Sequence, residues 1–457
     1  MKVHFIAIGG SAMHNLAIAL HKKGFIVTGS DDEIFEPAKS NLNKYGLLPS
    51  EIGWHPEILD ESYDAIILGM HAREDNPELI KAKETGLKIF SYPEYIYEQS
   101  KNKKRVVIGG SHGKTTITAM IIHVLRKAGI DTDYLVGAQL EGFETMVKIS
   151  NDAPVIILEG DEYLTSPIDK RPKFHLYKPH LALLSGIAWD HINVFPTFEE
   201  YYKQFLTFAN TIEDNGILTY FTDDLNLQRV SKESKSNIEK IPYQTHQFTI
   251  KDGITYLTDR GQLNVPIKVF GKHNLQNISG AKVICNNLGI NDDTFYNAIS
   301  SFPGASKRLE TVYKNDNFIF YRDFAHSPSK LSATASAVKQ QYPEKELTAC
   351  IELHTFSSLN KTFLKEYFGT MNEPDIAVVY FNPETIEHKK LESISIEDIK
   401  VAFGRKDIIV FNKSSELLQF LKSKSWKNRI LLMMSSGNFD GINMFDLANE
   451  FENLKIC

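Results

Sequence analysis

A glycine-rich turn after an apolar strand is the part of this sequence with the clearest chemistry. Residues 105–116 have the sequence RVVIGGSHGKTT, in which three glycines precede Lys-Thr-Thr and a helical pattern. Glycine allows positive φ and close approach of an anion to the backbone, and the amides that open the next helix point at negative charge. We expect this turn to bind nucleotide phosphate, with Lys114 on the β- and γ-phosphates and the Thr115 hydroxyl on Mg²⁺.

The turn is one residue shorter than the common phosphate loop GxxxxGK[ST], which requires glycine where this chain has Ile108. The alternative is a strand-to-helix turn with a surface lysine. We favour the phosphate loop because the strand, the glycines, Lys-Thr-Thr and the helix occur together. The residues predicted to contact the nucleotide in this turn are Gly110, Ser111, His112, Gly113, Lys114, Thr115 and Thr116.

Polar residues follow the next two predicted strands. The segment EGDEY begins at Glu159, and WDH ends at His191. Ligands of open α/β sheets bind at the carboxyl ends of strands, so Glu159 is the leading Mg²⁺ ligand and His191 a second candidate. The alternatives are that Asp161 and Glu162 cap a following helix and that His191 is a satisfied structural group.

Three residues nearer the C-terminus are candidates for contacts with a nucleotide. Asn274, in the run GKHN, suits either an adenine edge or a helix N-cap. Arg308 carries a planar fork of donors that suits phosphate, and Asp323 is an acceptor for ribose hydroxyls. The alternative for Arg308 and Asp323 is an ion pair between domains.

The elements around these residues alternate between strand and helix, which predicts the α/β class. Residues 3–32 form a βαβ unit that ends in two aspartates, as in a Rossmann domain, although the GxGxxG positions are Ala7, Gly9 and Ala12. Further strands are predicted at 65–69, 88–90, 155–158, 181–184, 318–322, 347–351, 376–380, 407–411 and 429–434, and helices at 115–128 and 329–340.

A chain of 457 residues is long enough for about three domains. We predict domains at residues 1–100, 101–302 and 303–457. The basic run 101–105 is expected to be a solvated linker, and residues 212–270 a small, mostly antiparallel addition within the central domain.

Composition excludes several classes of protein. The chain has 42% hydrophobic and 24% charged residues and a formal net charge of -6, so it lacks the basic field that nonspecific nucleic-acid binding requires. Its 3 cysteines form no CxxC pair, which favours reduced thiols and a cytoplasmic location. No apolar run approaches the length of a membrane span, and nothing points to an obligatory protein partner.

The order of the motifs resembles that of the Mur ligases of bacterial cell-wall synthesis over essentially the whole chain. The matching pieces are AIGGSAM, GGSHGKTT, EGDEY, WDHINVF, GKHNLQN, FPGASKR and DFAHSP. The resemblance implies a Rossmann-like N-terminal domain that binds a UDP-sugar, a central phosphate-loop ATPase domain, and a Rossmann-like C-terminal domain that binds the incoming amino acid or peptide. The residues implied in UDP-sugar binding are Gly9, Gly10, Ser11, Ala12, Met13, Ser30, Asp31 and His71.

The resemblance also implies a reaction. ATP phosphorylates the lactyl carboxylate of UDP-N-acetylmuramate, and the amine of an acceptor attacks the acyl phosphate to form an amide. The implied roles are Lys114 on the transferred phosphoryl group, Thr115 and Glu159 on one Mg²⁺, His191 on a second metal, and Asn274, Arg308 and Asp323 on ATP.

The N-terminal glycine turn is similar to that of the branch that uses UDP-N-acetylmuramate. This branch contains one enzyme that adds L-alanine and a recycling enzyme that adds L-alanyl-γ-D-glutamyl-meso-diaminopimelate. Residues 159–174, EGDEYLTSPIDKRPKF, are similar to EADEYDTAFFDKRSKF of the recycling enzyme, so the tripeptide is the expected acceptor and L-alanine the alternative. Departures from the recycling pattern occur at Lys307, at Ser327 and at residues 351–356.

Other functions fit fewer of these features. A folylpolyglutamate synthetase shares the ATPase core, but the N-terminal βαβ unit argues against it. A nicotinamide dehydrogenase leaves the phosphate loop, Glu159 and His191 without a role. A noncatalytic nucleotide switch binds ATP but shows no amine-dependent release of phosphate.

Overall fold

The computed structural model describes residues 1–70, 72–138, 143–166, 168–189, 194–259, 263–305 and 308–454. The chain forms two compact units. The first consists of Met1–Ile187, Thr197–Gln244 and Ser279–Ala298, and the second of Ala188–Pro196, Thr245–Ile278 and Ile299–Cys457. The limits of the three predicted domains remain a prediction.

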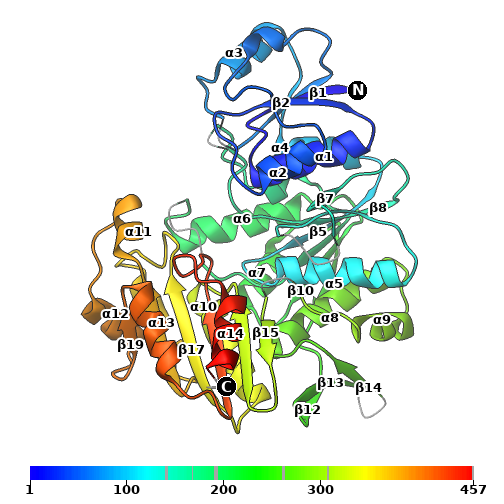
Figure 1. The fold of residues 1–457 in the computed structure, drawn as a ribbon. Helices are drawn as coiled ribbons and strands as arrows, with labels where there is room; N and C mark the ends of the chain where they lie inside the picture. The colour runs from blue at the N-terminus through cyan, green and yellow to red at the C-terminus, as the bar shows by residue number, and fades with distance from the viewer. Residues whose placement is uncertain are drawn as a thin grey trace. The chain divides into compact units, whose positions relative to one another are not determined.

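A parallel sheet opens the first unit, with strand order β2-β1-β3-β4. Strand β1, one of its two inner strands, is buried over Val3–Ile6, which is why the sheet needs cover on both faces. Figure 1 shows α1 and α3 on opposite sides of this sheet. The predicted βαβ unit is confirmed. The elements are β1 (Lys2–Ile6), α1 (Ser11–Lys22), β2 (Ile26–Ser30), α2 (Ala38–Lys44), η1 (Pro56–Ile58), β3 (Ala65–Leu68), α3 (Pro77–Glu84), β4 (Ile89–Ser91) and α4 (Tyr92–Ser100).

The second sheet of this unit has seven strands in the order β11-β10-β9-β5-β8-β6-β7. All neighbours run parallel except β6 and β7. Strand β5 lies in the middle, so the turn that follows it emerges at the centre of the carboxyl edge of the sheet. The strands are β5 (Lys104–Gly109), β6 (Asp133–Leu135), β7 (Val147–Lys148), β8 (Val155–Glu159), β9 (Leu181–Leu184), β10 (Ile217–Phe221) and β11 (Glu239–Tyr243).

Helices follow most of these strands. Helix α6 begins with a capping box in which Thr197 and Glu200 exchange side-chain and backbone hydrogen bonds. The helices are α5 (Lys114–Lys127), η2 (Lys173–Leu176), α6 (Phe198–Asn210), α7 (Leu225–Glu233) and α9 (Asp292–Ile299). Helix α8 (Lys272–Asn287) is divided between the two units, the second unit containing it up to Ile278.

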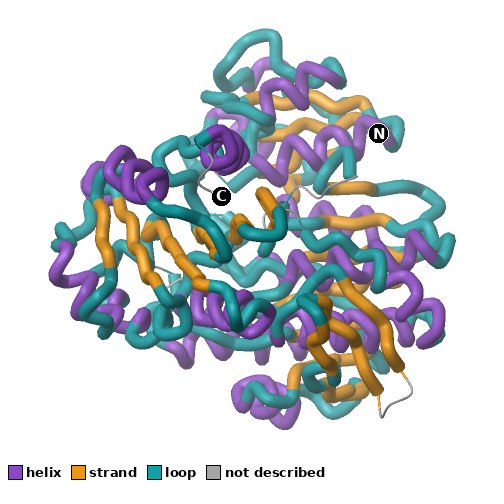
Figure 2. The backbone as a smooth tube through the Cα atoms, turned by 60° about the horizontal axis from the view of Figure 1, so that its bottom comes forward, coloured by secondary structure: helices purple, strands orange, loops and turns teal. Residues whose placement is uncertain are grey.

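The predicted antiparallel addition at 212–270 is wrong for its first half. Strands β10 and β11 extend the large sheet in parallel, with α7 between them. Only β12 (Phe248–Lys251), β13 (Ile254–Asp259) and β14 (Leu263–Ile267) form an antiparallel sheet, and Figure 2 shows β13 and β14 as a hairpin. Short half-buried strands look alike in sequence. The partner that joins β10 to the large sheet is β9, more than 30 residues earlier in the chain, and a local sequence pattern does not reveal such a pairing.

The basic run 101–105 is not a solvated linker throughout. Lys103 is 8% exposed and its ammonium lies 2.7 Å from the Asp133 carboxylate. Arg105 is 2% exposed and donates to backbone carbonyls on both sides of the junction, at Ser100 and at Tyr177. Both cations are therefore structural.

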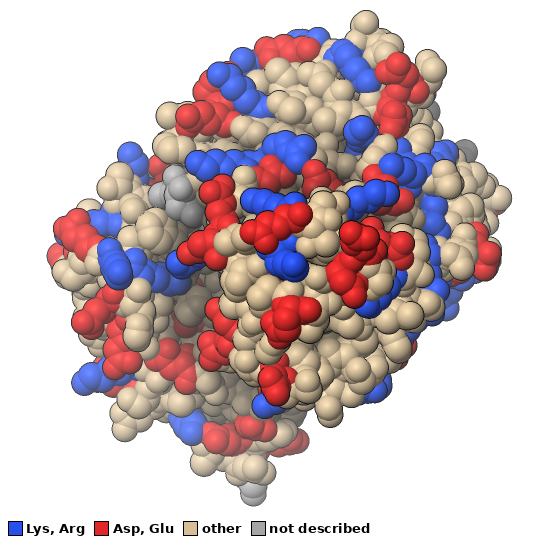
Figure 3. Space-filling model, turned by 90° about the horizontal axis from the view of Figure 1, so that it is seen from above, with Lys and Arg blue, Asp and Glu red and all other residues tan. Residues whose placement is uncertain are grey.

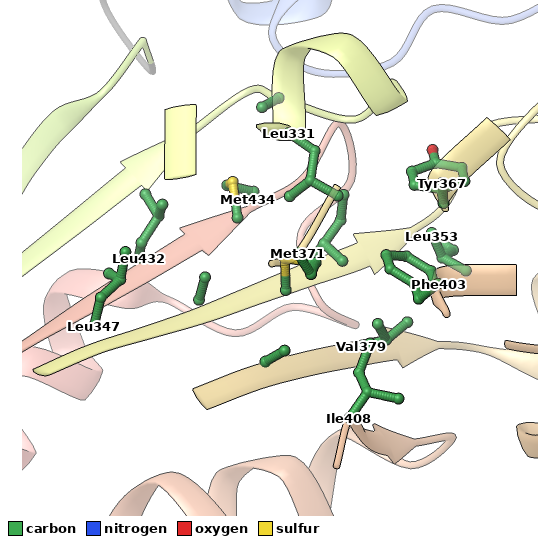
Figure 4. Close-up of a cluster of buried hydrophobic side chains, with 14 of the residues drawn as sticks. Leu331, Leu347, Leu353, Tyr367, Met371, Val379, Phe403, Ile408, Leu432 and Met434 are labelled. Atoms are coloured by element: carbon green, nitrogen blue, oxygen red, sulfur yellow. The ribbon is translucent and has the colours of Figure 1, made fainter. Parts of the chain in front are cut away.

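The second unit contains a six-stranded sheet in the order β15-β16-β20-β17-β18-β19, parallel except for β15. Figure 4 shows part of the apolar cluster on one face, where Leu331 and Leu353 are among the buried side chains. A second cluster around the fully buried Trp426 covers the other face. The strands are β15 (Glu310–Lys314), β16 (Phe318–Asp323), β17 (Glu346–Leu353), β18 (Ile376–Phe381), β19 (Ile409–Phe411) and β20 (Arg429–Met434).

Helices complete this α/β layering, which confirms the predicted fold class. They are α10 (Pro328–Gln341), η3 (Leu364–Tyr367), α11 (Pro383–His388), α12 (Ile396–Phe403), α13 (Ser414–Ser423) and α14 (Met444–Asn453). Within the described ranges, no helix has the length and apolar character needed to cross a membrane. On the face drawn in Figure 3, basic and acidic side chains are interleaved.

Candidate active site

The turn between β5 and α5 has the backbone of an anion-binding loop. Gly110 has φ +129° and Gly113 has φ +82°, conformations that favour glycine. A Cβ on Gly110 would lie 2.2 Å from the Ser185 hydroxyl, so only glycine fits there. Among the described residues, α5 has no side-chain N-cap and no acid in its first turn, which leaves its positive end suited to phosphate.

Lys114 lies across this loop. Its ammonium donates to the Gly110 carbonyl at 2.7 Å and forms an ion pair with the Glu162 carboxylate. Burial opposes the charged form, but the charges of Glu162 and Asp161 outweigh it and raise the pKa of Lys114. The lysine is therefore held as a cation beside the loop.

Thr115 and Glu159, the two predicted Mg²⁺ ligands nearest the loop, lie together. The Thr115 hydroxyl donates to Glu159 Oε1 at 2.9 Å, and the Gly137 amide donates to Glu159 Oε2 at 2.7 Å. A Cβ on Gly137 would lie 2.5 Å from Glu159 Oε1, so this glycine makes room for the carboxylate. Neighbouring hydroxyl and carboxylate oxygens suit Mg²⁺, which prefers oxygen ligands.

His191 lies outside the described residues, so its predicted role in metal binding stays a prediction. Within the described part of the chain, no group of three or more His, Cys, Asp or Glu side chains is arranged to hold a metal ion. Among the described residues, the candidate oxygen ligands at the loop are those of Thr115 and Glu159.

Asp161 and Glu162 do not cap a helix, which contradicts that alternative. Asp161 forms an ion pair with Lys173 at 2.6 Å, and Glu162 pairs with Lys114. Partial burial opposes ionisation of Asp161, but Lys173 and Lys114 outweigh it and lower its pKa to about 2. Both acids are thus held by ion pairs with lysines near the loop.

The glycine turn after β1 is closed by an acid at the end of β2. Asp31 Oδ2 accepts a hydrogen bond from the Gly9 amide at 2.7 Å, and Ala7 has φ +66°. Burial, together with the neighbouring Asp32, raises the pKa of Asp31 to about 6. The other residues implied in UDP-sugar binding differ in exposure. Ser30 and Met13 are buried, Gly9 and Gly10 are half-buried, and Ser11 and Ala12 are exposed. His71 lies outside the described residues.

Two polar residues of α1 near this turn escaped the sequence analysis. His14 Nδ1 donates to the Gly10 carbonyl at 2.9 Å, and Asn15 accepts from the Met146 amide at 2.8 Å. Both side chains are buried. The available signal was the presence of two adjacent polar residues inside an apolar helical stripe.

In the second unit, Asp323 ends β16 and is fixed by three donors. Its carboxylate accepts from the Leu309 and Phe324 amides at 3.1 and 2.8 Å and from the Thr334 hydroxyl at 2.6 Å. The Arg308 guanidinium lies 4.9 Å from the centre of the Phe324 ring. The structure therefore brings Arg308 and Asp323 to the same edge of this sheet.

Asn274 is the third residue of α8, so the N-cap alternative is wrong for it. Its amide donates to the Phe270 carbonyl at 2.8 Å. The adjacent His273, which the sequence analysis missed, is half-buried. Desolvation lowers its pKa, the charge of Asp323 opposes this shift, and the charge of Arg308 adds to it.

Comparison with known proteins gives two family matches. Residues 2–104 match the model described as Mur ligase family, catalytic domain, and residues 108–285 match the Mur ligase middle domain. The UDP-N-acetylmuramate–L-alanine ligase of Caldicellulosiruptor bescii is 30% identical, with 83% of each chain covered. That of a Sulfurihydrogenibium species is 27% identical, with 96% of this chain and 95% of the relative covered.

Solved structures show the same fold. The UDP-N-acetylmuramate-alanine ligase MurC of Thermotoga maritima has a TM-score of 0.70 and 19% identity, covering 100% of this chain and 99% of that one. A murein peptide ligase of Psychrobacter arcticus has a TM-score of 0.64 and 22% identity, covering 99% of both. The MurF ligase of Thermotoga maritima, solved with ADP, has a TM-score of 0.61 and 17% identity, covering 86% of this chain and 89% of that one.

A glycine-rich turn from the central strand of a parallel sheet to a helix is the architecture typical of nucleotide-binding enzymes. The chain belongs to the Mur ligase family. It is a ligase that forms carbon–nitrogen bonds, and the family prediction is confirmed. The predicted order within the family, with the tripeptide enzyme first, is not confirmed: the curated relatives are named L-alanine ligases, whereas the solved neighbours include both kinds.

Proposed function

We propose that this chain uses ATP to join the lactyl carboxylate of UDP-N-acetylmuramate to the amine of an acceptor that begins with L-alanine. The observation that carries the proposal is the meeting of Lys114, Thr115 and Glu159 at the phosphate loop, with 2.9 Å between the Thr115 hydroxyl and the carboxylate. Family membership supplies the class of reaction.

Two acceptors fit this proposal, and a different observation favours each. The names of the curated relatives favour L-alanine, and they do so over nearly the full length of the chain. The segment 159–174, with its similarity to the recycling branch, favours the tripeptide L-alanyl-γ-D-glutamyl-meso-diaminopimelate. Both acceptors present the same L-alanyl amine.

The chemistry has two steps. The carboxylate attacks the γ-phosphorus of ATP, which releases ADP and forms an acyl phosphate. The amine then attacks the acyl carbon, and the tetrahedral intermediate expels phosphate and loses a proton to give the amide. Because phosphoryl transfer depends on positioning and charge neutralisation, the Lys114 ammonium would balance the charge on the transferred group.

Mg²⁺, when bound, supplies further positive charge on the phosphate oxygens. Thr115 and Glu159 would hold it, and His191 is proposed to serve a second metal. Asn274, Arg308 and Asp323 of the second unit are proposed nucleotide contacts. A cytoplasmic location likewise remains a prediction.

The test is release of phosphate from ATP in the presence of Mg²⁺ and UDP-N-acetylmuramate, with L-alanine or the tripeptide as the added amine. We expect release that depends on the amine. Selectivity for L-alanine supports the first acceptor and selectivity for the tripeptide supports the second. Amine-independent release, or none, would reject the proposed ligation.

A further inference from the structure

Two side chains from outside the phosphate loop connect its first and last residues. Tyr201, on α6, hydrogen-bonds with the Ser111 hydroxyl at 3.0 Å and donates to Glu162 Oε1 at 3.3 Å. The other oxygen of Glu162 pairs with Lys114, whose ammonium returns to the Gly110 carbonyl at 2.7 Å. The contacts form a closed ring around the loop.

This ring is shielded from solvent. Tyr201 is 0% exposed, Ser111 is 5% exposed and the Glu162 side chain is 2% exposed. Hydrogen bonds in such surroundings are electrostatically stronger than in water. The Tyr201 ring packs edge-on against Phe205, with centroids 5.1 Å apart. This packing holds the ring, and with it the position of the hydroxyl.

The loop has reason to need such support. It is short, its conformation relies on glycines with positive φ, and the described residues give α5 no side-chain N-cap. A lysine side chain also loses much rotamer freedom when it is fixed. Holding Ser111 and Lys114 in advance lowers the ordering cost that nucleotide binding would otherwise carry.

We propose that Tyr201 and Glu162 are positioning residues for ATP: they hold the Ser111 hydroxyl and the Lys114 ammonium in the arrangement that receives the phosphates. This inference rests on the proposed use of ATP by the loop. Neither residue contacts the reacting atoms in this scheme; both act through Ser111 and Lys114.

The chain offers a matched control on the same helix. Tyr202 is also buried, and its hydroxyl donates to Glu233 at 2.9 Å, with the Arg229 guanidinium 4.1 Å from the ring centre. Tyr201→Phe and Tyr202→Phe each remove one hydroxyl that donates to a carboxylate, but only the first touches the ring around the loop.

The experiment measures ATP affinity by calorimetry, steady-state KM values, and thermal unfolding of the full chain. Tyr201→Phe removes the contacts of this hydroxyl with Ser111 and Glu162. We expect ATP affinity to fall and the KM for ATP to rise about 3- to 10-fold, which is the size of one net hydrogen bond. The KM for UDP-N-acetylmuramate should not change. Tyr202→Phe should leave both KM values at the wild-type level.

A double-mutant cycle tests whether Tyr201 acts through Glu162. In a Glu162→Gln background, Tyr201→Phe should have a smaller effect on ATP affinity than in the wild type, because coupled residues are not additive. Equal ATP affinity in Tyr201→Phe and wild type would overturn the inference, as would an equal rise in both KM values. A wild-type chain that fails to bind ATP would instead overturn the proposed function.

Discussion

At the scale of single residues, the charges around the phosphate loop are balanced within a few ångströms. The Lys114 cation faces Glu162, Asp161 faces Lys173, and the Glu159 carboxylate is held by a hydroxyl and an amide. The sequence predicted that these charged residues lie near the loop, but it did not predict which residues they pair with. Glu162 and Tyr201 meet across 39 positions of chain, and only the folded sheet brings them together.

Lys114→Ala should abolish ligation, with a loss of at least about 100-fold in kcat, because a charge donor at the transferred phosphoryl group is removed. Binding of UDP-N-acetylmuramate should remain measurable by calorimetry. Lys127→Ala, at the exposed end of α5, is the matched control. Near-normal turnover of Lys114→Ala would reject the phosphate-loop assignment.

Asp31 should make stability depend on pH. Its folded pKa of about 6 lies above the usual value of 3.8, so the folded state binds the proton more tightly and loses stability as pH rises from 4 to 6. Asp31→Asn should therefore stabilise the chain at pH 7.5 by on the order of 1–3 kcal/mol, with no gain at pH 4. Thermal unfolding at both pH values checks this, and an equal gain at pH 4 would contradict it.

At the scale of elements, strand periodicity and glycine turns predicted most of the large sheets. The predicted strand at 181–184 coincides with β9, and helix 115–128 differs from α5 by one residue at each end. Strands β6 and β7 were missed because they are only three and two residues long. Residues 217–243 were wrongly predicted to belong to an antiparallel sheet. Whether a strand pairs in parallel or antiparallel depends on residues that are distant in the sequence.

Gly110→Ala should disrupt the turn between β5 and α5 more than positive φ alone explains. The added Cβ would meet the Ser185 hydroxyl, so the turn must shift. Gly129→Ala, at φ +75° with nothing within 4 Å, isolates the backbone cost of about 1 kcal/mol. We expect only Gly110→Ala to lose ATP binding in calorimetry, and equal ATP affinity in the two variants would contradict this assignment.

At the scale of the whole molecule, the two compact units carry different parts of the proposed chemistry. The first contains the phosphate loop and the glycine turn closed by Asp31, and the second contains Arg308 and Asp323. Composition predicted a globular chain of several domains, and the motifs predicted the family. The sequence did not determine the acceptor substrate, because recognition of the acceptor depends on tertiary contacts more than on the order of motifs.

Ligands should stabilise the folded chain by mass action. UDP-N-acetylmuramate at 100 times its Kd should add about 2.7 kcal/mol and raise the Tm by several degrees. The same rise is expected in Lys114→Ala, whereas the rise with ATP and Mg²⁺ should shrink in that variant. Differential scanning calorimetry distinguishes the two, and loss of both shifts in Lys114→Ala would point to general damage.

The buried Lys103 and Arg105 of the basic run 101–105 affect where the chain can be cut into fragments for expression. A stretch that reads KNKKR invites the design of separate expression fragments that begin or end there. Arg105, however, donates hydrogen bonds to the Ser100 carbonyl on one side of such a cut and to the Tyr177 carbonyl on the other. A fragment that begins at residue 101 leaves this guanidinium without its Ser100 acceptor, so expression of the chain without a cut at this run is the better starting point.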